Sequence, residues 1–176
     1  GENYAQELRD KRVLVEKSLG RKVNWHFIGR IQRNKVKYVV GSVELIHSLD
    51  SIKVAEEMNN RADRLGINVP ILIEVNAGEK FKGGVKFEGV PEFLGELRRL
   101  PHLNVEGLMI MPPYFDDPEM ARPHYKNLRE LRDKLQKGHP GLIELSMGMS
   151  VDFEVAIEEG ATIVRIGTAI FGSRAQ

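Results

Sequence analysis

Two short turns of small residues near the end of the sequence have the composition of an anion-binding site. Ser146–Gly148 (SMG) and Gly167-Thr168 each follow a short apolar run. Glycine lets the backbone approach a ligand closely, and successive backbone N–H groups form a concave site for an anion. The serine and threonine hydroxyls would add donors, and a helix beginning near Ser150 would direct its positive end to the same place. The pattern predicts phosphate binding, although turns that only cap helices use the same residues.

Arg165 is the one charged residue in the apolar run that precedes the second turn, where it is flanked by Val164 and Ile166. An unpaired charge is costly to bury, so this arginine needs a partner. One candidate is a carboxylate on another strand, such as Glu74 in the run PILIEVN. The other candidate is a ligand held by the adjacent turn. The sequence alone leaves both open.

Six short apolar and β-branched runs predict the strands that would position these residues. The runs are Asn24–Gly29, Leu45–Asp50, Pro70–Asn76, Val105–Pro112, Ile143–Gly148 and Thr162–Ile166. Apolar residues at three- to four-residue spacing predict helices between them. The helical segments are Ala5–Leu19, Gln32–Val40, Ile52–Leu65, Phe93–Leu100 behind Pro91, Leu128–Leu135 before Gly138, and Val151–Glu159.

Strands that alternate with helices predict an α/β fold with a parallel sheet in one domain, residues 1–176. The strands are apolar on both faces, as expected when helices cover them. An open doubly wound sheet and most of a (β/α)8 barrel both fit. In either fold, ligands bind at the carboxyl ends of the strands. Ser146, Gly148, Gly167 and Thr168 all fall at such ends.

Composition narrows the function classes. The 176 residues include 26 basic and 25 acidic residues, a net charge of +1. This balance gives no electrostatic reason to expect nucleic acid or an anionic membrane as a partner. Cysteine is absent, which excludes disulfides and thiolate chemistry. No apolar run approaches the roughly 20 residues of a membrane span and no signal peptide is visible, so we expect a cytoplasmic protein.

Two histidines, His26 and His47, lie inside predicted strands. A lone strand histidine is more often a core residue with hydrogen-bond partners than a ligand. No set of His, Asp and Glu residues has metal-ligand spacing, so we expect no metal site. Tyr4 and Tyr114 could flank a pocket, although surface loops explain them equally well.

Several longer segments resemble one family. This family is the pyridoxal 5'-phosphate (PLP) homeostasis proteins. The segments that resemble it are WHFIGRIQRNK (25–35), GLMIMPP (107–113), LSMGMSVDFEVAI (145–157) and VRIGTAIFG (164–172). GENYAQE (1–7) and VNAGEKFKGGV (75–85) fit the same pattern. These proteins are in turn similar to the N-terminal barrel domain of alanine racemase. The resemblance implies a (β/α)8 TIM-type barrel that binds PLP at its carboxyl ends. It also implies a role in carrying or buffering intracellular PLP, with no established turnover and with PLP-dependent apoenzymes as possible recipients.

The resemblance assigns roles to individual residues. Ser146, Gly167 and Thr168 correspond to the phosphate ligands, helped by N–H groups of the turn after Gly148. Arg165 corresponds to the residue that faces the pyridine nitrogen. An arginine there keeps this nitrogen unprotonated, which makes the ring a poorer electron sink. Asn3 corresponds to a residue beside the ring.

The sequence departs from the family at the Schiff-base lysine, which members carry on the first strand, upstream of the GENY stretch. We therefore expect a barrel without its first strand and most of its second, with six strands visible and no catalytic residue in this chain. Lys82 is the nearest substitute, but a solvated loop charge explains it better. The alternatives to a carrier are a PLP-dependent racemase or lyase barrel, and a phosphate-binding barrel unrelated to PLP.

Overall fold

The computed structural model describes residues 1–80 and 82–172, and its strands form a single parallel sheet. Within these residues the strands are β1 (His26–Phe27), β2 (Leu45–Leu49), β3 (Val69–Val75), β4 (Leu103–Ile110), β5 (Glu144–Met149) and β6 (Ile163–Arg165). Their order in the sheet is β1-β2-β3-β4-β5-β6. A doubly wound sheet reverses its strand order at a switch point. The sequential order is therefore not that of a doubly wound sheet, one of the two folds that the sequence left open.

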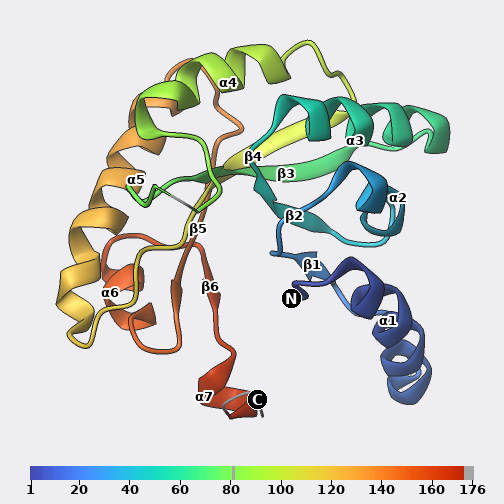
Figure 1. The fold of residues 1–176 in the computed structure, drawn as a ribbon, viewed down its shortest axis with the longest axis horizontal. Helices are drawn as coiled ribbons and strands as arrows, with labels where there is room; N and C mark the ends of the chain where they lie inside the picture. The colour runs from blue at the N-terminus through green and yellow to red at the C-terminus, as the bar shows by residue number, and fades with distance from the viewer. Residues whose placement is uncertain (81, 173–176) are drawn as a thin grey trace.

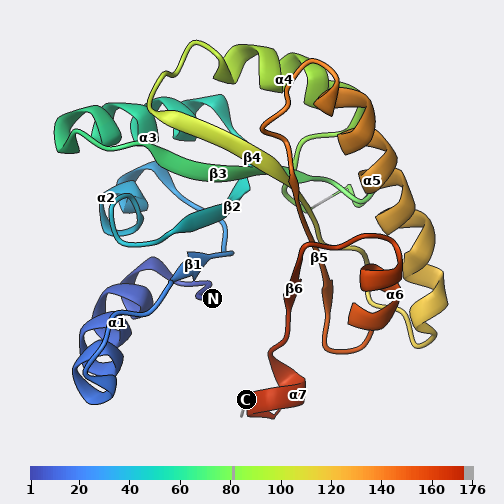
Figure 2. The ribbon, with the colours of Figure 1, turned by 180° about the vertical axis from the view of Figure 1, so that it is seen from behind.

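Helices follow the strands and cover one side of the sheet. They are α1 (Ala5–Leu19), α2 (Val36–Val39), α3 (Ile52–Leu65), α4 (Val90–Leu97), α5 (Arg122–Gln136), α6 (Phe153–Glu158) and α7 (Thr168–Phe171), with short 3-10 turns η1 (Arg33–Lys35), η2 (Phe87–Gly89) and η3 (Pro118–Ala121). In Figure 1, α3 to α6 form an outer arch and the strands curve inside it; Figure 2 shows the same arrangement from behind. The molecule is a six-stranded half-barrel with a convex helical layer and a concave inner face.

The two faces of the sheet differ in composition. Along β3, Ile71, Ile73 and Val75 belong to the large hydrophobic cluster shared with the helices. Leu72, which alternates with them, belongs to a separate small cluster with Leu45, Met109 and Ile163. Because successive strand residues point to opposite faces, this second cluster marks the inner face. The main core therefore lies between sheet and helices, and the inner face has only a small apolar layer.

A segment before α1 extends the sheet at the β1 side. Glu2 forms an isolated parallel bridge with Phe27. Its N–H donates to the carbonyl of His26 at 2.9 Å, and the N–H of Ile28 donates to the Glu2 carbonyl at 3.0 Å. Gly29 allows this approach, because a Cβ at that position would overlap the backbone of Asn3. The chain around Glu2 thus lies beside β1 where a neighbouring strand would lie.

All six predicted strands are present, and the differences lie in the lengths of elements. The predicted helix 32–40 is divided into η1 and α2, and the predicted helix 151–159 begins at Phe153. The second difference has a local cause, because the Asp152 carboxylate accepts the N–H of Met149 at 2.7 Å and holds a turn there. Within residues 1–80 and 82–172, no helix is both long and apolar enough to cross a membrane.

Candidate functional site

The two turns singled out in the sequence meet at the side chain of Ser150. The backbone N–H groups of Gly167 and Ala169 both donate to the Ser150 hydroxyl oxygen, each at 3.2 Å. Gly167 and Thr168 are exposed, so this contact lies at the surface of the molecule. Two N–H groups that converge on one oxygen are the arrangement that binds a phosphate oxygen. Ser150, which the sequence indicated only as a helix start, links the two turns.

Gly148 shapes the first of these turns. Its φ is 90°, a left-handed conformation that side chains rarely adopt. A Cβ on Gly148 would also lie 2.5 Å from the Cβ of Ala156 in α6. The glycine therefore lets the end of β5 pack directly on α6, which brings Ser150 toward the loop after β6.

Arg165 turns its guanidinium into the half-barrel rather than onto a carboxylate. Nη1 donates to the Ser146 hydroxyl at 2.7 Å, and Nη2 donates to the Ile110 carbonyl at 3.0 Å. Burial lowers the pKa of Arg165, and the nearby Tyr125, Glu74 and Asp152 oppose this shift. The guanidinium is thus fixed at two points between β4 and β5.

Glu74 does not form the direct ion pair with Arg165 that the sequence suggested. No ion pair within 4.0 Å joins them among the described residues, and the contacts of the guanidinium are instead with the Ser146 hydroxyl and the Ile110 carbonyl. Glu74 still interacts with Arg165 at longer range. Burial, reinforced by Asp50, raises the pKa of Glu74 to about 7, while Arg165 and Arg30 oppose the shift. The inner face therefore carries a carboxyl group that titrates near neutrality.

A hydrogen-bond chain that the sequence did not indicate runs across the inner face. His26 Nδ1 lies 3.0 Å from His47 Nε2, and His47 Nδ1 lies 2.8 Å from the Ser146 hydroxyl oxygen. His47 and Ser146 are both buried. Burial, His26 and Arg165 lower the pKa of His47 to about 3, so the ring is neutral at physiological pH. His47 is a buried residue with hydrogen-bond partners, as expected for a strand histidine, whereas His26 is only half-buried.

The register of the sheet separates Ser146 from the phosphate turn. Ser146 pairs with Ile163, whereas Met149 pairs with Arg165, two residues before Gly167. Ile163 is four residues before Gly167, so at about 3.3 Å per strand residue Ser146 lies roughly 13 Å deeper in the half-barrel than the turn. Its place among the phosphate ligands stays a prediction, and the geometry favours Ser150 for that role.

Asn3 and Lys82 lie on other loops at the carboxyl ends of the strands. Asn3 is exposed and lines a cavity of about 300 Å³ with Tyr4, Arg30 and Lys35. Lys82 forms an ion pair of 2.8 Å with Glu79, and its side chain is 48% exposed. Lys82 is therefore a solvent-exposed charge in a loop, paired with a nearby glutamate.

The loop that carries Lys82 is organised by Asn76 at the end of β3. Its carboxamide oxygen accepts the N–H groups of Gly78 and Glu79 at 2.7 and 2.9 Å. Its nitrogen donates to the carbonyls of Glu79, Lys82 and Gly83 at 3.0 to 3.1 Å. One side chain thus fixes the loop beside Glu74 and Asp50. The sequence signal for it was an Asn followed by a glycine-rich stretch.

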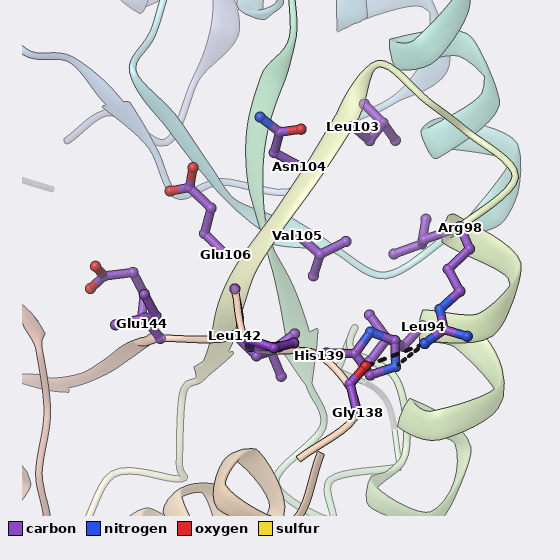
Figure 3. A pocket seen from close by; sticks show the side chains of 14 residues that line it. Leu94, Arg98, Leu103, Asn104, Val105, Glu106, Gly138, His139, Leu142 and Glu144 are labelled. Carbon is purple, nitrogen blue, oxygen red and sulfur yellow. Dashed lines mark hydrogen bonds between the residues drawn. The ribbon is translucent and has the colours of Figure 1, made fainter. Parts of the chain in front are cut away.

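A larger cavity than the one beside Asn3 lies at the opposite end of the strands. It has a volume of about 780 Å³ and is lined by the start of β4, the start of β5 and the end of α4. In Figure 3, Arg98 and His139 lie on one side of it and Glu106 and Glu144 on the other. Ligands of barrel folds bind at the carboxyl ends. We therefore place the candidate site at Ser150, Gly167 and Arg165 and not in this cavity. Among the described residues, no group of three metal-ligating side chains is present.

Comparison with known proteins gives first a broad class of protein and then a family. The sequence matches the alanine racemase N-terminal domain over residues 5–175, which places the chain in that class of α/β proteins. It is 53% identical to the pyridoxal phosphate homeostasis protein of Aquifex aeolicus, over 99% of this chain and 76% of the relative. It is 40% identical to the protein of the same name from Vibrio alginolyticus, again over 99% and 76%.

A solved structure agrees with these relatives. The structure of PipY from Synechococcus elongatus with PLP bound superposes with a TM-score of 0.84 at 31% identity, over 98% of this chain and 80% of that one. The chain belongs to the family of pyridoxal phosphate homeostasis proteins.

Proposed function

We propose that this chain binds PLP at the carboxyl ends of β5 and β6 and acts in PLP homeostasis in the cytoplasm, as a carrier or buffer of the cofactor. One observation carries the proposal: the N–H groups of Gly167 and Ala169 converge on a single oxygen, that of Ser150. Relatives that are named for PLP homeostasis, and a solved relative that holds PLP, support it.

The donor set fits the two ends of this cofactor. For the phosphate, we propose the N–H groups of Gly167 and Ala169 together with the hydroxyls of Thr168 and Ser150. The turn after Gly148 supports them. An exposed set of neutral donors suits a dianion that must both bind and leave. Ser146, which the family resemblance adds to this set, lies deeper in the half-barrel.

For the ring, we propose that Arg165 faces the pyridine nitrogen and that Asn3 lies beside the ring. Bound PLP supplies a reactive aldehyde and an electron-withdrawing ring. Arginine is a hydrogen-bond donor that does not give up its proton in proteins. It therefore donates to the ring nitrogen without protonating it, and the ring stays a weak electron sink. This arrangement favours holding the cofactor over carbanion chemistry.

We further infer that the six strands are part of a (β/α)8 barrel and that residues 1–176 form one domain. The sequential parallel strand order supports this inference. The bridge between Glu2 and Phe27 supports it too, because it places backbone beside β1 at the position of another strand.

Equilibrium titration with PLP, followed by absorbance and fluorescence, tests the proposed function. We expect saturable binding that inorganic phosphate weakens and that sugar phosphates do not reproduce spectrally. Equal binding of sugar phosphates would instead indicate a phosphate-binding barrel unrelated to PLP. Incubation of the loaded protein with L-alanine tests the racemase or lyase alternative. Sustained formation of D-alanine or keto acid would overturn the carrier role, and PLP transfer to an added apoenzyme would support it.

A further inference from the structure

Four side chains form a continuous hydrogen-bonded chain across the inner face of the half-barrel. His26 on β1 contacts His47 on β2, His47 contacts Ser146 on β5, and Ser146 accepts from Arg165 on β6. The His47–Ser146 contact joins strands that are not neighbours in the sheet. Side chains that meet across a curved sheet in this way fix the separation of its two halves.

The protons in this chain can be assigned by elimination. Arg165 can only donate, so the Ser146 oxygen accepts from it. Among the described residues, the remaining partner of the Ser146 hydroxyl is His47 Nδ1. A buried hydroxyl that donates to no acceptor is costly, so the Ser146 proton points to Nδ1.

The neutral His47 ring then carries its own proton on Nε2 and donates it to His26 Nδ1. The proton of His26 is accordingly on its Nε2. All donors in the chain are oriented in one direction, away from the positive charge of Arg165.

We propose that Ser146 and His47 are positioning residues for Arg165, which hold its guanidinium in the orientation that faces the ring of the bound cofactor. The inference rests on the proposed PLP function. The Ser146 hydroxyl supplies the acceptor for Nη1, and His47 fixes the direction of that hydroxyl. The Ile110 carbonyl supplies the acceptor for Nη2, so the guanidinium plane is set by one side chain and one backbone group. Burial of His47 and Ser146 prevents water from replacing either partner.

A first measurement needs no cofactor. Nitrogen-15 NMR of the histidine rings should show His47 as a neutral ring protonated at Nε2 between about pH 5 and 8, and should show the neutral form of His26 protonated at Nε2. In Ser146→Ala, the resonances of His47 Nδ1 and of the Arg165 guanidinium should both shift. A His47 ring protonated at Nδ1, or an Arg165 resonance that S146A leaves unchanged, would overturn the proposal.

The second measurement separates the ring end of the cofactor from its phosphate end, by comparing the dissociation constants of PLP and of inorganic phosphate. S146A and His47→Ala should weaken PLP binding about tenfold, the effect of one charged hydrogen bond, and leave phosphate binding within about twofold. Thr168→Ala should weaken both. His47→Asn, whose amide oxygen can accept at the position of Nδ1, should restore PLP binding toward that of the unchanged protein.

Ser48→Ala is the matched control, because Ser48 is also a buried strand hydroxyl but donates to the Gly29 carbonyl. It should change neither constant. Equal losses of PLP and phosphate binding in S146A would make Ser146 a phosphate ligand and overturn its positioning role. If the unchanged protein fails to bind PLP, the proposed function fails, and the NMR measurement still decides whether Ser146 and His47 orient Arg165.

Discussion

The outer and inner faces of the curved sheet use neighbouring residues of the same strands for different purposes. On β3, Ile73 and Val75 pack into the helical layer, while Glu74 between them faces Arg165 and Asp50. The outer face is a large hydrophobic core of aliphatic and aromatic side chains. The inner face combines a small apolar layer with a polar network. We infer that the outer face supplies most of the stability, which allows the inner face to carry groups that cost stability but bind a ligand.

Truncation of the outer core should give the largest effect on folding. Leu108 on β4 is fully buried in the outer cluster. Leu108→Ala should lower the free energy of unfolding by about 2–5 kcal/mol, because it removes buried methyl groups and leaves a cavity. Urea unfolding followed by circular dichroism measures this loss.

Leu14→Ala is the control for that truncation, since the side chain lies on α1 and is 68% exposed. It should cost less than about 0.5 kcal/mol. Similar losses for the two variants would show that the outer cluster is not the main source of stability.

Glu74 gives the next largest effect, as a dependence of stability on pH. Its pKa is about 7 in the folded protein against 4.5 for an unperturbed glutamate, so between these values the folded state binds more protons than the unfolded state. The stability contributed by neutral Glu74 is complete below pH 4.5 and is lost as pH rises through 7, by up to about 3 kcal/mol. Unfolding midpoints of wild type and Glu74→Gln across this range measure it. A difference between the two proteins that does not change with pH would contradict it.

Thr168 tests the phosphate end of the inner site. Thr168→Ala should weaken phosphate and PLP binding by about 1–3 kcal/mol, the contribution of one hydrogen bond to a charged acceptor. It should leave the unfolding free energy nearly unchanged, because Thr168 is exposed. Isothermal titration calorimetry and urea unfolding of the same preparation separate the two effects, and a loss of stability without a loss of affinity would count against the site.

Removal of the hydrogen bond between Trp25 and Glu16 of α1 should lower the free energy of unfolding less than the changes at Leu108 and Glu74. The Trp25 indole donates to Glu16 at 3.1 Å. Glu16→Ala should cost about 1 kcal/mol, less than the usual value for a carboxylate acceptor, because this hydrogen bond is only partly buried. Tryptophan fluorescence during unfolding reports this contact, since Trp25 is the single tryptophan of the chain. A loss as large as that of Leu108→Ala would mean that a polar contact of α1 contributes as much stability as a buried core side chain.

The outer face was largely predictable from sequence, and the reason is periodicity. Helical spacing identified the apolar side of α3, and short β-branched runs located all six strands. Where local side chains compete with the backbone, prediction was less accurate. The turn at Asp152 makes α6 begin at Phe153 and not at Val151. The helix α7 has four residues, which is too short to show a helical period.

The inner site was predictable only in part. Glycine turns and an arginine in an apolar strand pointed to Gly167 and Arg165, because those residue types are unusual in their local setting. The contact between His47 and Ser146 could not be predicted in this way. The two residues lie 99 positions apart in the sequence, and neither is an unusual residue type for its own strand. The convergence of the Gly167 and Ala169 N–H groups on Ser150 likewise depends on how two loops pack, which the sequence does not encode locally.

The same long-range link has a consequence for folding kinetics. Because every strand pairs with the strand before it, the sheet can grow by adding successive βα units, each closing a short loop. The His47–Ser146 hydrogen bond is different, because it requires β2 and β5, which are not neighbours in the sheet, to be in place together. We expect it to be among the last contacts formed. The rate at which the native resonance of the His47 ring proton appears during refolding would then report when the sheet is complete.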